Sequence, residues 1–301
     1  MATVKDWITA FRLRTLFLAV ATVILGSGIA LHEESFGMTT FMLTLLLAVS
    51  IQILANLAND LGDFQKGTDT TGRRQGPART LQSGKISSRE MKGAIVVFSL
   101  ICIITGLSLI FNNIYYIPFS SAVILIGFGG VSILAALFYT LGKHAYGYKG
   151  WGDLLAFLFF GPVPVIGTYF LHTHQFNFQP VLPAIGIGLI SAMILNINNM
   201  RDIENDRSSG KITIAVKLGI NKAKLYHGIL TLTSFLFFFC YSTLYAPIPW
   251  YRYLYLLAFL FLFRIMDCIR KKNGHELDPY LRLTSLSGFL LALLFSVCIN
   301  I

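Results

Sequence analysis

Asn and Asp side chains gather at two places where long hydrophobic segments end, and they are the residues of this sequence best suited to chemistry. The first group contains Asn56, Asn59, Asp60 and Asp63. At 100° per residue, these side chains share about 100° of one helix face. A carboxylate at bilayer depth costs about 2.5–3.5 kcal/mol, so a chain that keeps several there is expected to use them. The alternative is a helix end whose polar side chains only contact water or cap the helix.

The second group contains Asn198, Asp202 and Asp206, which we expect to stack along one helix face at positions i, i+4 and i+8. Like charges at this spacing repel unless a cation lies between them. Arg201 and Arg207 are interleaved with the acids and could neutralise them instead. Both groups follow the order Asn, Asp, Asp with slightly different spacing. We therefore interpret them as two halves of one site.

Carboxylate oxygens suit hard cations such as Mg²⁺, which commonly binds one or two carboxylates together with substrate phosphates. The sequence has no His or Cys set with metal-ligand spacing, which argues against zinc. The pattern thus predicts four Mg²⁺ ligands: Asp60, Asp63, Asp202 and Asp206.

Basic residues follow both groups and could bind the phosphate oxygens of a substrate. The candidates are Arg79 and Lys85 after the first group and Lys211 after the second. Such loops also arise from the positive-inside rule alone. A metal, an anion clamp and apolar walls together fit a prenyl diphosphate. Metal would stabilise the leaving diphosphate, and a dry cavity would protect the allylic cation from water while an acceptor carbon attacks it.

Long uncharged segments must position these groups. The chain has 301 residues, 55% hydrophobic and only 13% charged, which indicates an integral membrane protein. No charged residue occurs between Lys92 and Lys143 or between Asp153 and Arg201, and each stretch is too long for one crossing. We expect one all-α domain over residues 1–301 with nine transmembrane helices. The predicted spans are 12–31, 38–60, 93–111, 117–140, 153–171, 181–200, 225–246, 250–266 and 283–300.

The net charge of +10 could suggest nucleic acid, but the placement of the basic residues argues against it. With nine spans, only Arg252 of the 24 Lys and Arg residues falls on the second side. The positive-inside rule then predicts a cell-membrane protein with a cytoplasmic N-terminus, cytoplasmic site loops and an outer C-terminus. The span at 250–266 crosses only if Arg252 and Arg264 extend toward the headgroups.

Three segments resemble the UbiA superfamily of intramembrane aromatic prenyltransferases, and the resemblance covers nearly the whole chain. They are NLANDLGDFQKGTDTTGRRQGPARTLQSGKIS, YTLGKHAYGYKGWGDLLAFLFFGPVPVIGTYF and NNMRDIENDRSSGKITIAVKLG. The resemblance implies nine helices around a central cavity and two aspartate-rich motifs that bind Mg²⁺ and diphosphate. The details are similar to the branch that prenylates 1,4-dihydroxy-2-naphthoate.

Carried over by position, the resemblance implies that Asp60, Asp63, Asp202 and Asp206 hold metal, and it adds substrate contacts. These are Asn56, Asn59, Arg79, Lys85, Asn198 and Lys211.

The resemblance also implies roles nearer the acceptor. Tyr139 matches a tyrosine beside the reacting carbon, although an interfacial belt tyrosine is the alternative. Arg14 is expected to hold the acceptor's carboxylate. Asp153 is either a contact in the acceptor pocket or a helix cap. Asp69 stands two residues beyond the usual place of a further acid, where this chain has Gly67, so its contact with metal stays open.

The implied reaction is transfer of a polyprenyl group to 1,4-dihydroxy-2-naphthoate, with loss of diphosphate and CO₂, giving demethylmenaquinone. Another aromatic acceptor, such as 4-hydroxybenzoate or homogentisate, is the first alternative. A transporter is the second, but its charged site is expected near the midplane, at broken helices. A lipid phosphotransferase would need a tighter acidic motif on one helix. The expected partners are polyprenyl diphosphate, the naphthoate and the bilayer, while tail length, the number of Mg²⁺ ions and oligomeric state stay open.

Overall fold

The computed structural model describes residues 2–68, 76, 79–143, 145–245 and 249–301, and these residues form helices and connecting loops without a strand. The all-α prediction is therefore confirmed for the described part of the chain. The α-helices are α1 (Val4–Phe11), α2 (Leu13–His32), α3 (Met38–Gln65), α4 (Ser88–Asn113), α5 (Phe119–Phe138), α6 (Gly152–Phe159), α7 (Pro162–Thr173), α8 (Val181–Arg201), α9 (Ile203–Ser208), α10 (Ile214–Leu218), α11 (Ile220–Tyr245), α12 (Ala258–Lys271) and α13 (Asp278–Asn300). The 3₁₀-helices are η1 (Tyr146–Tyr148), η2 (Trp250–Leu257) and η3 (Gly274–Leu277).

Eight segments of the described chain are long and apolar enough to cross a membrane. They coincide with eight of the nine predicted spans, and most boundaries differ by a few residues. The predicted span at 153–171 is broken, because α6 ends at Phe159 and α7 begins at Pro162. A Cβ on Gly161, between them, would lie 2.5 Å from the Cα of Gly188. Only glycine allows α8 to approach the break this closely.

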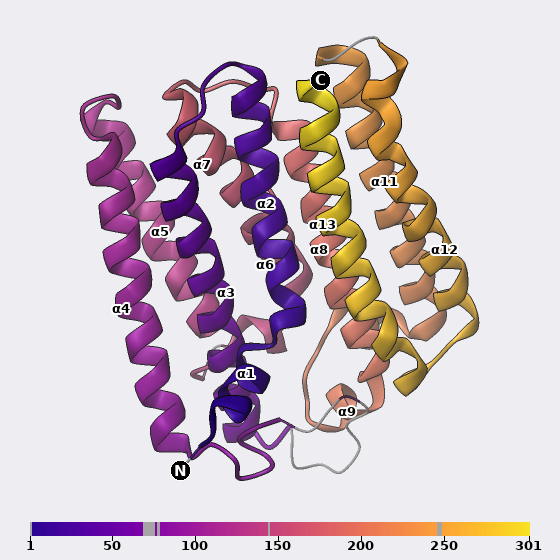
Figure 1. The fold of residues 1–301 in the computed structure, drawn as a ribbon. Coiled ribbons are helices and arrows are strands. Elements are labelled where there is room, and N and C mark those ends of the chain that lie inside the picture. Colours follow the sequence, from indigo (N-terminus) through magenta and orange to yellow (C-terminus); the bar gives the residue numbers. More distant parts are fainter. Residues whose placement is uncertain (1, 69–75, 77–78, 144, 246–248) are drawn as a thin grey trace.

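The predicted span at 250–266 is not one continuous α-helix, and it is the predicted span that is missing from these eight segments of the described chain. Residues 250–257 form η2, and α12 continues to Lys271. A 3₁₀-helix rises about 2.0 Å per residue and an α-helix about 1.5 Å, so the two together cover about 37 Å. This composite element packs beside α11 and α13 (Figure 1). Its length is enough for a ninth crossing.

The two termini lie at opposite ends of the bundle (Figure 1). An odd number of crossings requires this arrangement, which agrees with the composite ninth element. Figure 1 also shows α9 at the end where the N-terminus lies. The second carboxylate group reaches that end through α8 and α9, and α1 lies at the same end beside α3.

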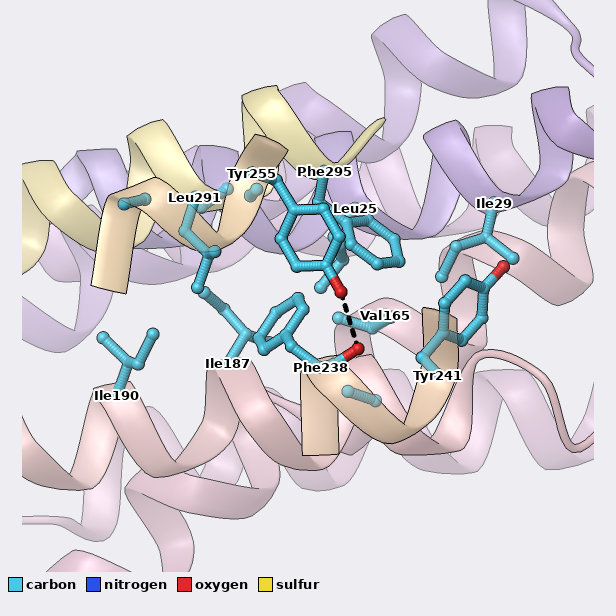
Figure 2. Close-up of a cluster of buried hydrophobic side chains, with 14 of the residues drawn as sticks. Leu25, Ile29, Val165, Ile187, Ile190, Phe238, Tyr241, Tyr255, Leu291 and Phe295 are labelled. Atoms are coloured by element: carbon cyan, nitrogen blue, oxygen red, sulfur yellow. Dashed lines mark hydrogen bonds between the residues drawn. The ribbon is translucent and has the colours of Figure 1, made fainter. Parts of the chain in front are cut away.

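Aromatic side chains fill the centre of the C-terminal half. Phe295 of α13 meets Phe238 and Tyr241 of α11 and Tyr255 of η2, with ring centroids 5.0–5.3 Å apart and edges directed at faces. The Tyr255 hydroxyl donates to the Phe238 carbonyl oxygen at 2.7 Å (Figure 2). This bond satisfies a polar group that lipid could not satisfy. The cluster thereby anchors η2 between α11 and α13.

Small residues let α2 and α13 lie close together. A Cβ added to Gly28 would lie 2.4 Å from the Cβ of Ser296 and 3.1 Å from its Cα. The Ser296 hydroxyl donates to the Ile24 carbonyl oxygen, and the Asn300 amide donates to that of Gly28. Close backbone approach and interhelical hydrogen bonds are the main attractions between helices in lipid.

Gly28→Val is therefore expected to destabilise the bundle by about 1–3 kcal/mol, because α13 must move away from α2. Thermal unfolding in detergent measures the effect. Gly106→Val in α4 is the matched control, since a Cβ there has no neighbour within 4 Å. Equal unfolding midpoints for the two variants would show that the α2–α13 contact is not needed for stability.

Candidate active site

The last turns of α3 carry the first carboxylate group on one face. This group contains Asn56, Asn59, Asp60 and Asp63. Asp60 and Asp63 are only 2% and 1% exposed, so this is not a helix end that merely reaches water. The Asn56 amide donates to the Phe11 carbonyl oxygen and to the Thr15 hydroxyl, both at 2.9 Å. These bonds tie α3 to the junction of α1 and α2.

Arg79 folds back from the loop after α3 and pairs with both carboxylates of this group. Its Nη2 lies 2.6 Å from Asp63 Oδ2, and its Nε lies 3.7 Å from Asp60 Oδ1. Its Nη1 donates to the Asn59 carbonyl oxygen at 2.8 Å. The Thr80 hydroxyl donates to Asp60 Oδ2 at 2.8 Å. One guanidinium and one hydroxyl thus compensate two buried carboxylates.

The second carboxylate group lies where α8 ends and α9 begins. It contains Asn198, Asp202 and Asp206. We expected one continuous helix face, but the regular helix is interrupted at Asp202, whose φ is −99° and ψ is 16°. Hydrogen bonds from the Asp202 and Asp206 amides to the residues four positions earlier carry the chain through the bend. The three side chains therefore belong to the end of α8, to the bend and to the short helix α9, and not to one helix.

Arg201 neutralises part of this group, which was one of the alternatives that the sequence left open. Its Nη2 lies 2.6 Å from Asp202 Oδ2, and its Nη1 lies 2.5 Å from Asp278 Oδ1 at the start of α13. Arg207 does not take part, because it pairs with exposed Glu204 at 3.6 Å. Of the two interleaved arginines, Arg201 is therefore the one that compensates this group.

Lys211 lies between the two groups and brings them together. Its Nζ is 3.7 Å from Asp206 Oδ1. Burial alone would lower the pKa of Lys211, but the charges of Asp63 and Asp206 raise it above its ordinary value, so the ammonium form persists. Burial raises the pKa of Asp206 to about 6 although Lys211 opposes this. The Asn205 amide also donates to the Thr68 carbonyl oxygen at 3.3 Å, which joins the loops.

The carboxylate groups border an apolar cavity of about 500 Å³, which Asn56, Asn59 and Asn198 line while Asp60, Asp63, Asp202 and Asp206 do not. Helices from both halves of the chain form its walls, including α2, α4, α5, α7 and α8. The polar residues at the mouth include Arg14, Asn59, Arg79, Tyr139, Asn198 and Lys211. A smaller cavity of about 340 Å³ is lined by several of the same residues together with Arg201 and Asp60. The arrangement offers charged groups at one end and a long apolar space at the other.

Tyr139 and Asp153 lie on the loop and helix that border this mouth. Tyr139 follows α5 and faces the cavity, with its ring edge-on to Tyr146 at 5.4 Å, so it is not a lipid-facing belt residue. Asp153 is 3% exposed, and its Oδ1 accepts no hydrogen bond from the described residues. It is not the helix cap, because α6 begins at Gly152 with Trp151 at the N-cap position.

Arg14 lies at the start of α2, where it lines both cavities and pairs with Asp278 at 3.5 Å. Lys85, expected beside the diphosphate, lies elsewhere. It is exposed, lines neither cavity and stands near Asp6 of α1, because the Gly84 turn directs it away from the mouth. Asp69 lies outside the described residues.

Three residues at the site were not singled out from the sequence. Tyr148 and Thr80 contact the first carboxylate group directly, and Asp278 pairs with Arg201 and Arg14. The Tyr148 hydroxyl donates to Asp63 Oδ1 at 2.7 Å. Thr80 follows Arg79 directly, and Tyr148 belongs to a short polar loop between two spans. Their positions in the sequence therefore indicated the site only weakly. For Asp278, the first residue of the last helix, the sequence offers no such signal.

The donors of both groups fit Mg²⁺ as two half-sites. Within the described residues, no three His, Cys, Asp or Glu side chains form a ready ligand set. Buried Asp206 Oδ2 and Asp60 Oδ1 accept no hydrogen bond from the part of the chain that the structure describes, and both are hard oxygen donors. Mg²⁺ needs only one or two carboxylates when substrate phosphates complete its shell. These residues therefore suit a metal that arrives with a diphosphate.

The model of the UbiA prenyltransferase family matches residues 19–294. The chain belongs to this family. It is 39% identical to the 1,4-dihydroxy-2-naphthoate octaprenyltransferase of Haemophilus influenzae, over 97% of this chain and 95% of that protein. It is 36% identical to the enzyme of the same name from Escherichia coli, over 97% and 94%. The Mycobacterium tuberculosis enzyme of that name is 34% identical over 97% and 96%.

Solved structures of the family share the fold at low sequence identity. A UbiA homologue from Archaeoglobus fulgidus bound to GPP and Mg²⁺ gives a TM-score of 0.68 at 13% identity, covering 98% of this chain and all of that one. The apo homologue from Aeropyrum pernix gives 0.67 at 18% identity, covering 96% of each. These similarities, with the apolar helices, identify an integral membrane protein of the UbiA fold.

Replacing Arg201 by Met is expected to destabilise the protein by about 3–5 kcal/mol, because it removes the cation that pairs with buried Asp202. Thermal unfolding in detergent measures this loss. Arg207→Met is the control, since that arginine is 56% exposed and its ion pair lies at the surface. An unchanged midpoint in the Arg201 variant would argue against a compensating role for this ion pair.

Proposed function

We propose that this chain transfers a polyprenyl group from polyprenyl diphosphate to 1,4-dihydroxy-2-naphthoate, releasing diphosphate and CO₂. The observation that carries the proposal is the pair of carboxylate groups, with Arg79 and Lys211, at the mouth of a 500 Å³ apolar cavity. This arrangement suits a substrate with a diphosphate head and a hydrocarbon tail. Relatives 34–39% identical over nearly the full chain carry the octaprenyltransferase name, which supports the naphthoate as acceptor.

The head of the donor is assigned to the groups that converge at the mouth. Asp60, Asp63, Asp202 and Asp206 are the proposed Mg²⁺ ligands, and bound Mg²⁺ would offset the charge of the leaving diphosphate. Arg79 and Lys211 are the proposed phosphate contacts, since both are buried cations among these carboxylates. The amides of Asn56, Asn59 and Asn198 add polar contacts. Lys85 is left out of this set because of its exposed position.

The acceptor is assigned to the part of the mouth between α2 and α6. Arg14 lines the cavity there and would pair with the acceptor's carboxylate, and Tyr139 lies beside Gly152 at the cavity wall. Asp153 follows Gly152, and its Oδ1, which has no hydrogen-bond partner among the described residues, suits a hydroxyl of the hydroquinone. The ring carbon that carries the carboxylate bonds to the allylic carbon as the carbon–oxygen bond to diphosphate breaks. Loss of CO₂ then restores the aromatic ring.

The apolar walls protect this reaction from water. An allylic cation reacts quickly with water, so a site that forms one must exclude it. Beyond the polar mouth, the cavity is lined mainly by apolar side chains of membrane-spanning helices. The same walls accommodate the tail. Because helices from both halves of the chain line one cavity, we also propose that residues 1–301 act as a single domain.

We propose that the mouth of the cavity faces the cytoplasm. Most of the described Lys and Arg residues lie in loops, short helices or span ends on the side that holds the carboxylate groups and the N-terminus, and the positive-inside rule assigns that side to the cytoplasm. This orientation suits a soluble aromatic acceptor and a lipid-borne donor in the cell membrane. A transporter fits less well, since the carboxylates lie at helix ends and pair with cations.

The assay that tests the proposal combines purified protein, Mg²⁺, farnesyl diphosphate and 1,4-dihydroxy-2-naphthoate, with mass spectrometry of the product. Asp60→Asn and Asp206→Asn are expected to lower turnover by at least about 100-fold, since each removes a charged ligand from the metal site. Asp267→Asn is the control, because that half-exposed carboxylate pairs with Arg264 and Lys271 of its own helix, outside the site.

Parallel reactions with 4-hydroxybenzoate and homogentisate distinguish the acceptor. A prenylated product from one of these, and none from the naphthoate, would replace the acceptor and leave the reaction class intact. No product from any acceptor, with diphosphate still bound, would contradict the proposed transfer.

The path of the tail leads to a prediction about chain length. Gly106 of α4, Gly129 of α5 and Gly167 of α7 line the cavity, and a Cβ on each would meet no atom within 4 Å. Gly129→Leu should therefore lower kcat/KM for long prenyl diphosphates, relative to geranyl diphosphate, by about 10-fold or more. Gly127→Leu is the control on the same helix, since Gly127 has equal space but does not line the cavity. An unchanged ratio in Gly129→Leu would place the tail elsewhere.

A further inference from the structure

Tyr148, in the loop between α5 and α6, contacts Asp63 of the first carboxylate group and the chain segment that follows the second group. Tyr148 ends the short helix η1, and its backbone carbonyl oxygen accepts a hydrogen bond from the Ile212 amide at 3.1 Å. Lys211, the residue before Ile212, pairs with Asp206. The Tyr148 backbone thus holds the chain segment that follows the second carboxylate group.

The Tyr148 side chain holds the first group. Its hydroxyl donates to Asp63 Oδ1 at 2.7 Å and accepts from the Thr68 hydroxyl at 2.5 Å. Arg79 contacts the other oxygen of the same carboxylate, Asp63 Oδ2, at 2.6 Å. Both oxygens of Asp63 therefore have fixed partners.

The Tyr148 ring adds a third contact. Lys66 Nζ lies 4.6 Å from the ring centroid and Lys211 Nζ lies 5.5 Å from it, which are cation–π distances. Lys66 follows the first carboxylate group and Lys211 follows the second. One side chain therefore contacts a carboxylate of the first group and a basic residue beside each group.

Tyr146, two residues earlier, provides a comparison within the same short helix. Its hydroxyl donates to the Ala135 carbonyl oxygen at 2.6 Å, and its ring packs on Tyr139. It thus anchors the loop to α5 without touching a carboxylate. If the loop only needed packing, either tyrosine would serve equally well. The direct hydrogen bond to Asp63 distinguishes Tyr148.

We propose that Tyr148 is a positioning residue that fixes the Asp63 carboxylate and the spacing of the two carboxylate groups, and thereby sets the affinity for metal and diphosphate. The inference rests on the proposed function and adds a residue to that site. Partners that orient a ligating carboxylate typically change metal affinity by 10- to 100-fold when they are removed. Tyr148 differs from the proposed ligands because it acts through Asp63 and need not touch metal or substrate.

The test is Tyr148→Phe, which removes the hydroxyl but keeps the ring and the backbone bond to Ile212. Mn²⁺ titration followed by EPR, with geranyl thiodiphosphate present, measures the metal dissociation constant without turnover. We expect it to rise by about 10- to 100-fold. In the prenyl-transfer assay, the Mg²⁺ concentration for half-maximal rate should rise similarly, while kcat at saturating Mg²⁺ stays near the wild-type value.

Tyr146→Phe is the matched control and should leave the metal dissociation constant unchanged. Tyr148→Leu also removes the ring, and it should weaken metal binding further because the contacts with Lys66 and Lys211 are lost. Thermal unfolding of each variant shows whether folding is affected.

Two results would overturn the inference. A wild-type metal dissociation constant in Tyr148→Phe means that Asp63 is positioned without this hydroxyl. An equal shift in Tyr148→Phe and Tyr146→Phe, accompanied by lower unfolding midpoints in both, means that the tyrosines only support the loop. If the wild-type protein itself binds no Mn²⁺ with the thiodiphosphate, the proposed function fails together with the inference.

Discussion

Buried carboxylates compensated by cations of the same chain are the constraint on which the site depends. Asp63 pairs with Arg79, Asp202 with Arg201 and Asp206 with Lys211. At the edge of a membrane, a buried ion without a partner costs several kcal/mol, so these pairs dictate where loops and helix ends must lie. This need accounts for the position of Arg79 after α3, for the bend at Asp202 and for the position of Lys211. The result is a compact set of opposite charges above an apolar cavity.

The same pairs explain how one site can serve a metal and a phosphate group. Each of these cations compensates the charge of a carboxylate. A divalent ion could compensate the carboxylate instead, and the cation could then pair with a phosphate oxygen. Arg79 suits this exchange because its guanidinium can contact two oxygens at once. The cost of exposing a carboxylate is offset whenever metal and diphosphate arrive together. Each buried ion would thus change its partner and would still have an opposite charge beside it.

The sequence predicted the parts of this structure that follow from composition and local pattern. Carboxylates at the ends of spans stand out because membranes rarely tolerate them, so Asp60 and Asp206 could be singled out. Long apolar runs gave most span boundaries within a few residues. The break at Gly161 was missed because it depends on how closely α8 approaches, and hydropathy does not record a close approach. The composite of η2 and α12 was missed because 3₁₀ and α segments have similar hydropathy.

Contacts between distant segments account for most of the remaining differences. Tyr148 reaches Asp63 across a separation of 85 residues, and no local pattern encodes that hydrogen bond. Lys85 was expected beside the diphosphate because it shares a loop with Arg79. A turn at Gly84 with φ of 68° directs it elsewhere. The charge of a loop could be read from the sequence, but the direction in which each side chain points could not.

The position of Asp278 in the sequence implies an order in which the parts of the site come together during synthesis. This carboxylate begins α13, and it pairs with Arg14 of α2 and Arg201 of α8. A ribosome makes the chain from its N-terminus, so both arginines are synthesised long before the acid that joins them. Every proposed metal ligand is already present when α11 is complete. The charge network can close only when α13 inserts, so the newly made protein completes its site after α2 and α8 are already in place.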